Sequence, residues 1–96
     1  MQNEIKNILS LFNQKQFHKT KEIALNILNK KSDPQIYLIL GMSQSELNEI
    51  DDAIESIGKS IKIKPINPDA YNNLGTILNK MKDYDNAILN YKKAIE

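Results

Sequence analysis

The chain has 96 residues, of which 41% are hydrophobic and 26% are charged, and its formal net charge is +1. These values are typical of one small folded domain and exclude a disordered chain. The near-neutral charge provides no long-range attraction to nucleic acid or to an anionic membrane, and all 13 basic residues are lysines, which rules out bidentate arginine contacts.

The chain contains no cysteine, so it can form no disulfide, thiolate metal site or thiol nucleophile. Its first residues lack the basic and apolar regions of a signal peptide. Its longest apolar run, residues 36–40, is too short to span a bilayer. A soluble, cytoplasmic protein is therefore expected.

Residues 1–33 are predicted to form a helix over residues 5–12, a turn near His18 and a second helix. Phe17 and Thr20 align with Ile50 and Ala53 of the later sequence at a spacing of 33 residues. Two interpretations are open. The segment is either a divergent first copy of the repeat that follows or a single N-terminal capping helix, and we favour the divergent copy.

The rest of the chain carries one pattern twice, 34 residues apart. Pro34, Tyr37, Leu40, Gly41, Ala53 and Ile54 recur as Pro68, Tyr71, Leu74, Gly75, Ala87 and Ile88. A period of this length is typical of a helical repeat array. The repeated units are residues 34–67 and residues 68–96.

Each unit is predicted to fold as helix, turn and helix. Asp33 and Asn67 are good N-cap residues, because a short side-chain oxygen can accept from the free amides of the first turn. A proline follows each of them at the first helical position, where its missing N–H has no effect. Apolar residues then recur at helical spacing, and no stretch alternates like a strand. The chain is therefore predicted to be all-α.

A glycine in the first helix and an alanine in the second recur in both units, as Gly41 with Ala53 and Gly75 with Ala87. Glycine inside a helix costs about 1 kcal/mol relative to alanine, so a packing reason is expected. Antiparallel helices approach closely only where side chains are minimal. Each glycine is therefore predicted to face its alanine across the hairpin.

These residues resemble the tetratricopeptide repeat. The resemblance rests on Tyr37 and Tyr71, Leu-Gly at 40–41 and 74–75, Ala53 and Ala87, Tyr91, Ala94 and Pro65. It implies an all-α, right-handed solenoid of three helix-turn-helix hairpins, about six helices in one domain. Residues 68–96 follow the family pattern closely, residues 34–67 depart from it at Gln44, Ile57 and Ser60, and residues 1–33 are a degenerate first repeat. That first unit has Ile8 at the glycine position, with Ala24 and Ile27 in reversed order of size.

The resemblance also implies a protein–protein interaction module that binds a peptide or partner protein in a concave groove formed by the first helix of each repeat. Carried over to this chain, the groove residues are Leu38, Ile39, Met42, Asp69, Asn72, Asn73, Thr76 and Asn79, flanked by Gln35, Ser45, Glu46 and Lys80. The first unit would add Ile5, Leu9, Phe12 and Asn13. One end of this groove is apolar and the other is rich in amides. In an alternative interpretation, Leu38 and Ile39 pack between neighbouring first helices.

Two subtypes of the family can be compared with these positions. The chaperone-binding subtype clamps a C-terminal carboxylate, but only Asn73 matches its clamp, and Asp69 would repel a carboxylate. A second subtype carries an asparagine ladder and recruits substrates for a larger glycosyltransferase- or sulfotransferase-like enzyme. Asn73 fits one rung of that ladder and Ile39 interrupts the next. This enzyme-linked segment remains an alternative function.

Tyr84, Ile88, Tyr91 and Ile95 are predicted to lie on a face that a further repeat would cover, because the third unit lacks a C-terminal capping helix. Either the chain is part of a longer array or this face binds another copy. A self-assembling structural module is therefore a third alternative.

No catalytic, cofactor or metal site is expected. His18 is the sole histidine, and the three glycines are isolated rather than grouped in a phosphate-binding loop. Asp51, Asp52, Asp83 and Asp85 fall at the predicted starts of second helices, where acidic residues stabilise the helix. An enzyme and a nucleic-acid-binding protein are both disfavoured.

Overall fold

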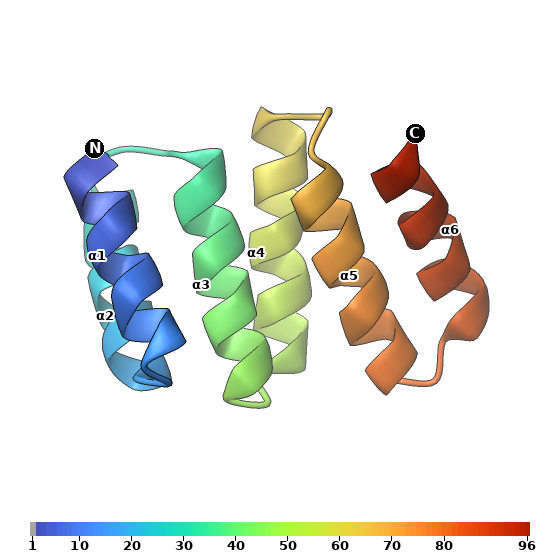
Figure 1. Ribbon diagram of the computed structural model, residues 1–96, viewed down its shortest axis with the longest axis horizontal. Helices are drawn as coiled ribbons and strands as arrows, with labels where there is room; N and C mark the ends of the chain where they lie inside the picture. The colour runs from blue at the N-terminus through green and yellow to red at the C-terminus, as the bar shows by residue number, and fades with distance from the viewer. Residues whose placement is uncertain (1) are drawn as a thin grey trace.

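The computed structural model describes residues 2–96, and all of the regular structure in this range is helical. The six helices are α1 Gln2–Asn13, α2 Phe17–Leu28, α3 Pro34–Glu46, α4 Ile50–Ile63, α5 Pro68–Lys80 and α6 Tyr84–Ile95. They form three antiparallel hairpins that stand side by side in chain order (Figure 1). The prediction of an all-α helical-repeat solenoid is confirmed.

The first helices of the hairpins form one layer and the second helices the other. α3 contacts both α1 and α5, so the first helices touch along the whole row, on the near side of Figure 1. Over the described residues, the second helices contact only first helices and not one another. The array therefore curves around the layer of α1, α3 and α5, which forms its inner surface.

The turn inside each hairpin has the same backbone conformation. Lys15, Asn48 and Lys82 adopt left-handed φ values of 62°, 62° and 65°. The amide of the next residue then donates to the carbonyl five positions earlier, at 3.0 Å (Leu11), 2.8 Å (Gln44) and 2.9 Å (Leu78). This bond satisfies a carbonyl at the end of the first helix, as in other left-handed helix terminations.

The helices α3 and α5 begin as predicted. The Asp33 carboxylate accepts from the amides of Gln35 and Ile36 at 2.8 and 3.1 Å, and the Asn67 side chain accepts from the amide of Ala70 at 3.2 Å. The prediction for His18 was wrong, because α2 begins at Phe17 and includes His18 in its first turn. The left-handed turn at Lys15 closes the hairpin earlier than the sequence suggested.

The glycines allow the backbones of a hairpin to meet. A Cβ added to Gly41 would lie 2.6 Å from Ile57 Cγ1 and 3.1 Å from the carbonyl oxygen of Ala53. A Cβ added to Gly75 would lie 2.8 Å from Tyr91 Cε1 and 3.2 Å from the carbonyl oxygen of Ala87. The predicted contact between each glycine and its alanine is therefore present, and Ile57 or Tyr91 fills the remaining space.

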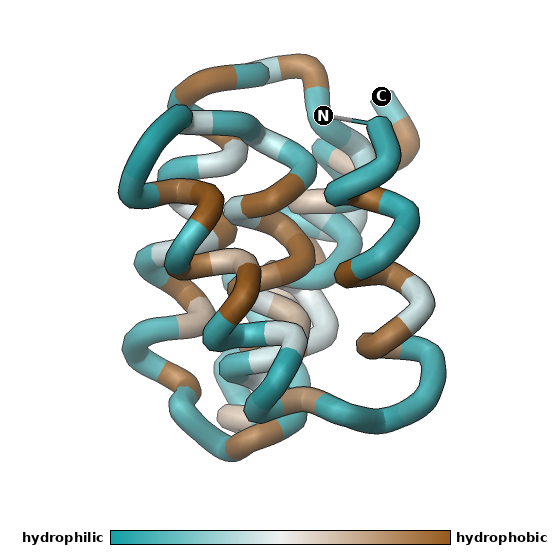
Figure 2. Tube along the Cα trace, turned by 90° about the vertical axis from the view of Figure 1, so that its left-hand side faces the viewer, coloured by the Kyte–Doolittle hydropathy of each residue, from teal (hydrophilic) through white to brown (hydrophobic). Residues whose placement is uncertain are grey.

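The core consists of two clusters, one at each seam between hairpins. The first contains Ile5, Ile8, Ala24, Ile36, Ile39 and Leu40, and the second contains Ala53, Ile57, Ala70 and Ile77. Ile8 and Ala24 are both fully buried, so the large residue on α1 packs with a small one on α2. Figure 2 shows hydrophobic segments alternating with hydrophilic ones along the trace. The middle hairpin contributes to both clusters.

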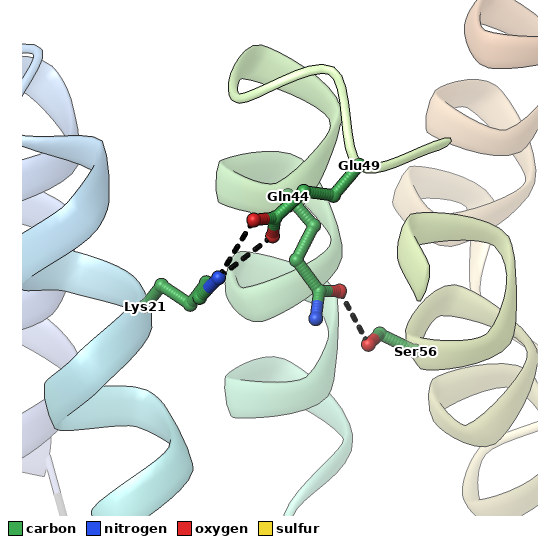
Figure 3. Close-up of polar contacts among 4 residues, drawn as sticks. All are labelled: Lys21, Gln44, Glu49 and Ser56. Carbon is green, nitrogen blue, oxygen red and sulfur yellow. Dashed lines mark hydrogen bonds and ion pairs between the residues drawn. The ribbon is translucent and has the colours of Figure 1, made fainter. Parts of the chain in front are cut away.

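Polar contacts also join the helices around the middle hairpin (Figure 3). Lys21 Nζ on α2 lies 2.8 Å from both carboxylate oxygens of Glu49, in the turn before α4. This pair is partly exposed and contributes at most about 1 kcal/mol. The buried Ser56 hydroxyl donates to Gln44 Oε1 at 2.6 Å. The repeat family that the chain resembles usually has an aromatic residue at the position of Gln44. Here the hydrogen bond from Ser56 satisfies the buried Gln44 oxygen instead.

Replacing Ser56 by alanine is expected to lower the free energy of unfolding by about 1 kcal/mol, because Gln44 Oε1 would stay buried without its donor. Replacing Gln44 by leucine as well removes both polar groups and should recover most of that loss. Urea denaturation of the wild type, both single variants and the double variant measures the coupling. If the losses of the two single variants add exactly in the double variant, Ser56 and Gln44 are not coupled, and the expectation is wrong.

Candidate functional site

The inner layer contains a hollow of about 260 Å³ that all three first helices line. Phe12 of α1, Met42, Ser45 and Glu46 of α3, and Asn73, Thr76, Ile77 and Lys80 of α5 form its walls. The structure therefore brings together seven residues that the sequence analysis placed in or beside the groove: Phe12, Met42, Ser45, Glu46, Asn73, Thr76 and Lys80.

The centre of this hollow is apolar and its rim is charged. Phe12 packs edge-on against Phe17 with ring centroids 5.2 Å apart, which fixes one wall. Met42 is half-buried, and its flexible thioether can adapt to the shape of a guest side chain. Glu46 and Lys80 lie exposed at the rim and supply one charge of each sign. A volume near 260 Å³ suits one or two side chains of a larger partner better than a whole drug-sized molecule.

The polar wall on α5 is held in place by hydrogen bonds within the protein. Asn73 Nδ2 donates to the carbonyl of Asp69 at 2.8 Å, which leaves the amide oxygen as an acceptor. Thr76 Oγ1 donates to the carbonyl of Asn72 at 3.0 Å and accepts from the Tyr91 hydroxyl at 3.2 Å. These groups are oriented before any partner arrives.

Two other predicted groove residues line a separate hollow of about 190 Å³. Leu38 and Asp69 share it with Asp33, Pro34, Gln35, Lys64 and Asn67, near the start of α3 and α5. Asn72 and Asn79 are exposed on α5 and line neither hollow. The single graded groove of the sequence analysis is thus divided into two hollows.

The placement of Ile39 and Ile5 in the groove was wrong. Ile39 is only 4% exposed and Ile5 only 6%, and both belong to the core cluster between the first two hairpins. α1 packs against this side of α3 and covers Ile39. For Ile39 the alternative interpretation, packing between first helices, is correct, whereas Leu38 is half-buried and reaches the second hollow.

Ile77 is the lining residue that the sequence analysis missed. It is 2% exposed and forms part of the wall between Asn73 and Lys80. The sequence does indicate this position of Ile77, because residues four apart share a helical face and Ile77 follows the predicted groove residue Asn73 by four positions.

The predicted face on α6 is present for three of its four residues. Tyr84, Ile88 and Ile95 are 55%, 51% and 86% exposed. Tyr91 is half-buried instead, because its ring occupies the space beside Gly75 and its hydroxyl bonds to Thr76. The prediction that Tyr91 lies on the exposed face was therefore wrong.

Between residues 2 and 96, no group of three histidine, cysteine, aspartate or glutamate residues is placed to hold a metal ion. None of the helices described is both long and apolar enough to cross a membrane.

Solved structures of other proteins share this fold. The MamA crystal structure aligns with 98% of this chain and 56% of its own, at 23% identity and a TM-score of 0.87. The Sgt2 domain from Aspergillus fumigatus aligns with 98% of this chain and 63% of its own, at 19% identity and a TM-score of 0.88.

The second tetratricopeptide domain of Spaghetti, solved bound to an HSP90 peptide, aligns with 97% of this chain and 87% of its own, at 12% identity and a TM-score of 0.85. At identities below 25%, these TM-scores show a shared fold alone. The chain spans about half the length of the MamA structures it matches, 56% and 52% for the first two.

Comparison of the sequence with protein-family models identifies the family of this chain. No curated protein sequence matches the chain. Tetratricopeptide repeat models match residues 34–67 and residues 68–96, about two thirds of its length. Both matches begin at the prolines that start α3 and α5, and each spans one hairpin of the array. The chain therefore belongs to the tetratricopeptide repeat family.

Proposed function

We propose that this protein is a non-catalytic binding module that holds a segment of a partner protein on its inner surface. The observation that carries the proposal is the hollow shared by α1, α3 and α5, with an apolar centre and pre-oriented polar groups. The Spaghetti domain of the same fold is solved with a peptide bound, which supports a peptide as the kind of ligand.

The chemistry of the hollow defines the preferred segment. A medium-sized apolar side chain fits against Phe12, Met42 and Ile77, where burial contributes about 1.5–3 kcal/mol. The Asn73 amide oxygen accepts a hydrogen bond from the backbone of the segment. The second hollow, with Leu38 and Asp69, takes a neighbouring residue of the same segment, and the Asp69 carboxylate favours a basic one.

Residues 1–33 form the first, divergent repeat in this proposal. Support comes from the turn at Lys15, which repeats the left-handed conformation and hydrogen bonding of the turns at Asn48 and Lys82. Ile8 takes the place of the repeated glycine, and the small Ala24 across from it compensates for its volume. Phe12 then lines the hollow from α1, the helix that is equivalent to α3 and α5 in the other two repeats.

The enzyme-linked alternative, a substrate-recruiting segment ahead of a transferase, depends on a row of asparagines along the groove. Asn73 is placed for one rung, but Ile39 at the next is buried in the core. The binding module is therefore the function that the site supports best.

Replacing Met42 by glutamate together with Asn73 by alanine is expected to weaken peptide binding at least about tenfold, because a charge enters the apolar centre and an acceptor is lost. The probe is a peptide selected on the wild-type protein from a random displayed library, measured by fluorescence anisotropy. Circular dichroism checks that both proteins remain equally helical.

The matched control places the same new charge on the outer layer. Gly58 on α4 is exposed, and a side chain built there would contact nothing within 4 Å. Gly58→Glu combined with Asn72→Ala changes the same kinds of groups outside both hollows. Equal loss of binding in the control, or unchanged binding in the test variant, would place the site elsewhere.

A further inference from the structure

The two hollows of the inner surface follow one another along the same pair of helices, α3 and α5, which run in the same direction (Figure 1). Leu38 and Asp69 line the second hollow, of about 190 Å³. Met42 and Asn73, one helical turn further along each helix, line the first, of about 260 Å³. Asn73 Nδ2 donates to the carbonyl of Asp69 at 2.8 Å. These four residues, here called the saddle, therefore separate two hollows that open on one surface.

The distance between the hollows follows from the rise of the two helices. The α3 side chains that line them are Pro34, Gln35 and Leu38 for the second hollow and Met42, Ser45 and Glu46 for the first. The middles of these two sets are about nine residues apart, which is about 13 Å along the helix. On α5, Asp69 and the middle of the first hollow are about eight residues apart, which is about 12 Å.

An extended segment matches this distance with two residues that are four positions apart. An extended chain rises about 3.3 Å per residue, so four residues span about 13 Å. Successive side chains point to opposite faces, and only an even spacing sends two of them into hollows on one surface. Spacings of two and six span about 7 and 20 Å and do not fit. A helical segment fits less well, because residues seven apart share a face but span only about 10 Å.

The residue midway between these two anchor residues faces the saddle. It shares their face of the extended segment, because it lies two positions from each. Leu38 and Met42 are half-buried at the saddle, so a glycine, alanine or serine of the segment fits there and a large side chain does not. The Asn73 amide oxygen can accept from the segment backbone as it crosses.

The charges of the second hollow select a basic anchor residue. Its walls carry the carboxylates of Asp33 and Asp69 against the ammonium of Lys64. One oxygen of Asp33 caps α3, and Asp69 is exposed in the first turn of α5. A lysine of the segment can lay its methylene groups on Leu38 and direct its ammonium to the carboxylates. An acidic residue at the same position would be repelled.

We propose that this protein recognises an extended segment with a basic residue in the second hollow and an apolar residue in the first, four positions apart, with a small residue midway. This inference rests on the proposed function and adds the spacing and chemistry of the anchor residues. The spacing is the same for either direction of the segment, because it depends only on the distance between the hollows.

A series of synthetic peptides tests the spacing. Each has blocked ends, a fluorescent label, and one lysine and one leucine two to eight positions apart in a background of serine and alanine, in both orders. We expect fluorescence anisotropy to show the tightest binding at a spacing of four. Peptides with a spacing of three or five should bind at least about tenfold more weakly, because one anchor residue then points to solvent. Phenylalanine midway should also weaken the binding of the spacing-four peptide.

Replacing Asp69 by asparagine tests the charge. This variant should bind the spacing-four lysine peptide about three- to fivefold more weakly than the wild type does, and should bind a peptide with glutamine in place of lysine equally well. The matched control is Asp51→Asn. Asp51 is exposed and is the second residue of α4, as Asp69 is of α5, but it lies on the outer layer. The control should change neither affinity.

Three results would overturn the proposal: an optimum at any spacing other than four, affinities that do not depend on spacing, and an equal loss for the lysine and glutamine peptides in Asp69→Asn. The library-selected peptide tests the proposed function separately. If that peptide is lost in the Met42→Glu and Asn73→Ala variant while the series shows no optimum at four, the binding module stands and this inference fails. If no peptide binds the hollows, both fail.

Discussion

Replacing Gly41 by alanine lowers the free energy of unfolding by about 2 kcal/mol, whereas the same replacement at Gly58 raises it by up to about 1 kcal/mol. Both residues lie inside helices of the middle hairpin, so alanine brings the same gain in helix propensity at each. The difference between them isolates the packing of α3 against α4.

The physical reason lies in what surrounds the added methyl group. At Gly41 it would meet the side chain of Ile57 at 2.6 Å and the backbone oxygen of Ala53 at 3.1 Å, and Ile57 is fully buried. The two helices must then separate or Ile57 must leave its rotamer. At Gly58 the methyl group meets nothing within 4 Å.

Urea denaturation and thermal melting measure both effects. A loss of about 2 kcal/mol corresponds to a fall in Tm of about 8–16 °C for a domain of this size. The result that contradicts the interpretation is a Gly41→Ala protein at least as stable as the wild type, which would mean that α3 and α4 separate at little cost.

Replacing Asn67 by alanine is expected to lower the free energy of unfolding by about 2 kcal/mol. Its side chain has two roles at the seam between the second and third hairpins. Its oxygen caps α5 by accepting from the amide of Ala70, and its Nδ2 donates to Ser60 Oγ at 3.0 Å. The Ser60 hydroxyl in turn donates to the carbonyl of Pro34 at 2.6 Å.

Asp33→Ala serves as the matched control for Asn67→Ala. Asp33 caps α3 in the same position of the preceding repeat, but it is less buried and makes only cap bonds. Its replacement should lower the free energy of unfolding by about 1 kcal/mol. If chemical denaturation gives the two variants equal losses, the Ser60 contact contributes nothing to stability.

The features that could be predicted from sequence are those fixed by local backbone chemistry. A proline after Asp33 or Asn67 defines a helix start wherever it occurs, and the 34-residue period then requires each helix to recur. Gly41 and Gly75 inside helices indicate close helix pairs for the same local reason. These signals suffice for the fold.

The site was harder to predict because it depends on which side of a helix its neighbour covers. Leu38 and Ile39 are adjacent and equally apolar, yet α1 buries Ile39 while Leu38 reaches a hollow. Tyr91 shares the helical spacing of the exposed residues Tyr84, Ile88 and Ile95 on α6, but its ring occupies the space beside Gly75 inside the hairpin. Both outcomes follow from the placement of a second helix, which the order of residues within one helix does not specify.

The division of the core into two clusters makes the order in which this protein loses structure depend on position in the array. Within residues 2–96, the first and third hairpins each share one buried cluster with a neighbour, whereas the middle hairpin shares both. Because a repeat array is stabilised by the interfaces between neighbouring repeats, the first or the third hairpin can unfold while the interface between the other two hairpins remains intact. A destabilising substitution in the first or third hairpin is therefore expected to weaken one cluster, whereas one in the middle hairpin, α3 and α4, can weaken both.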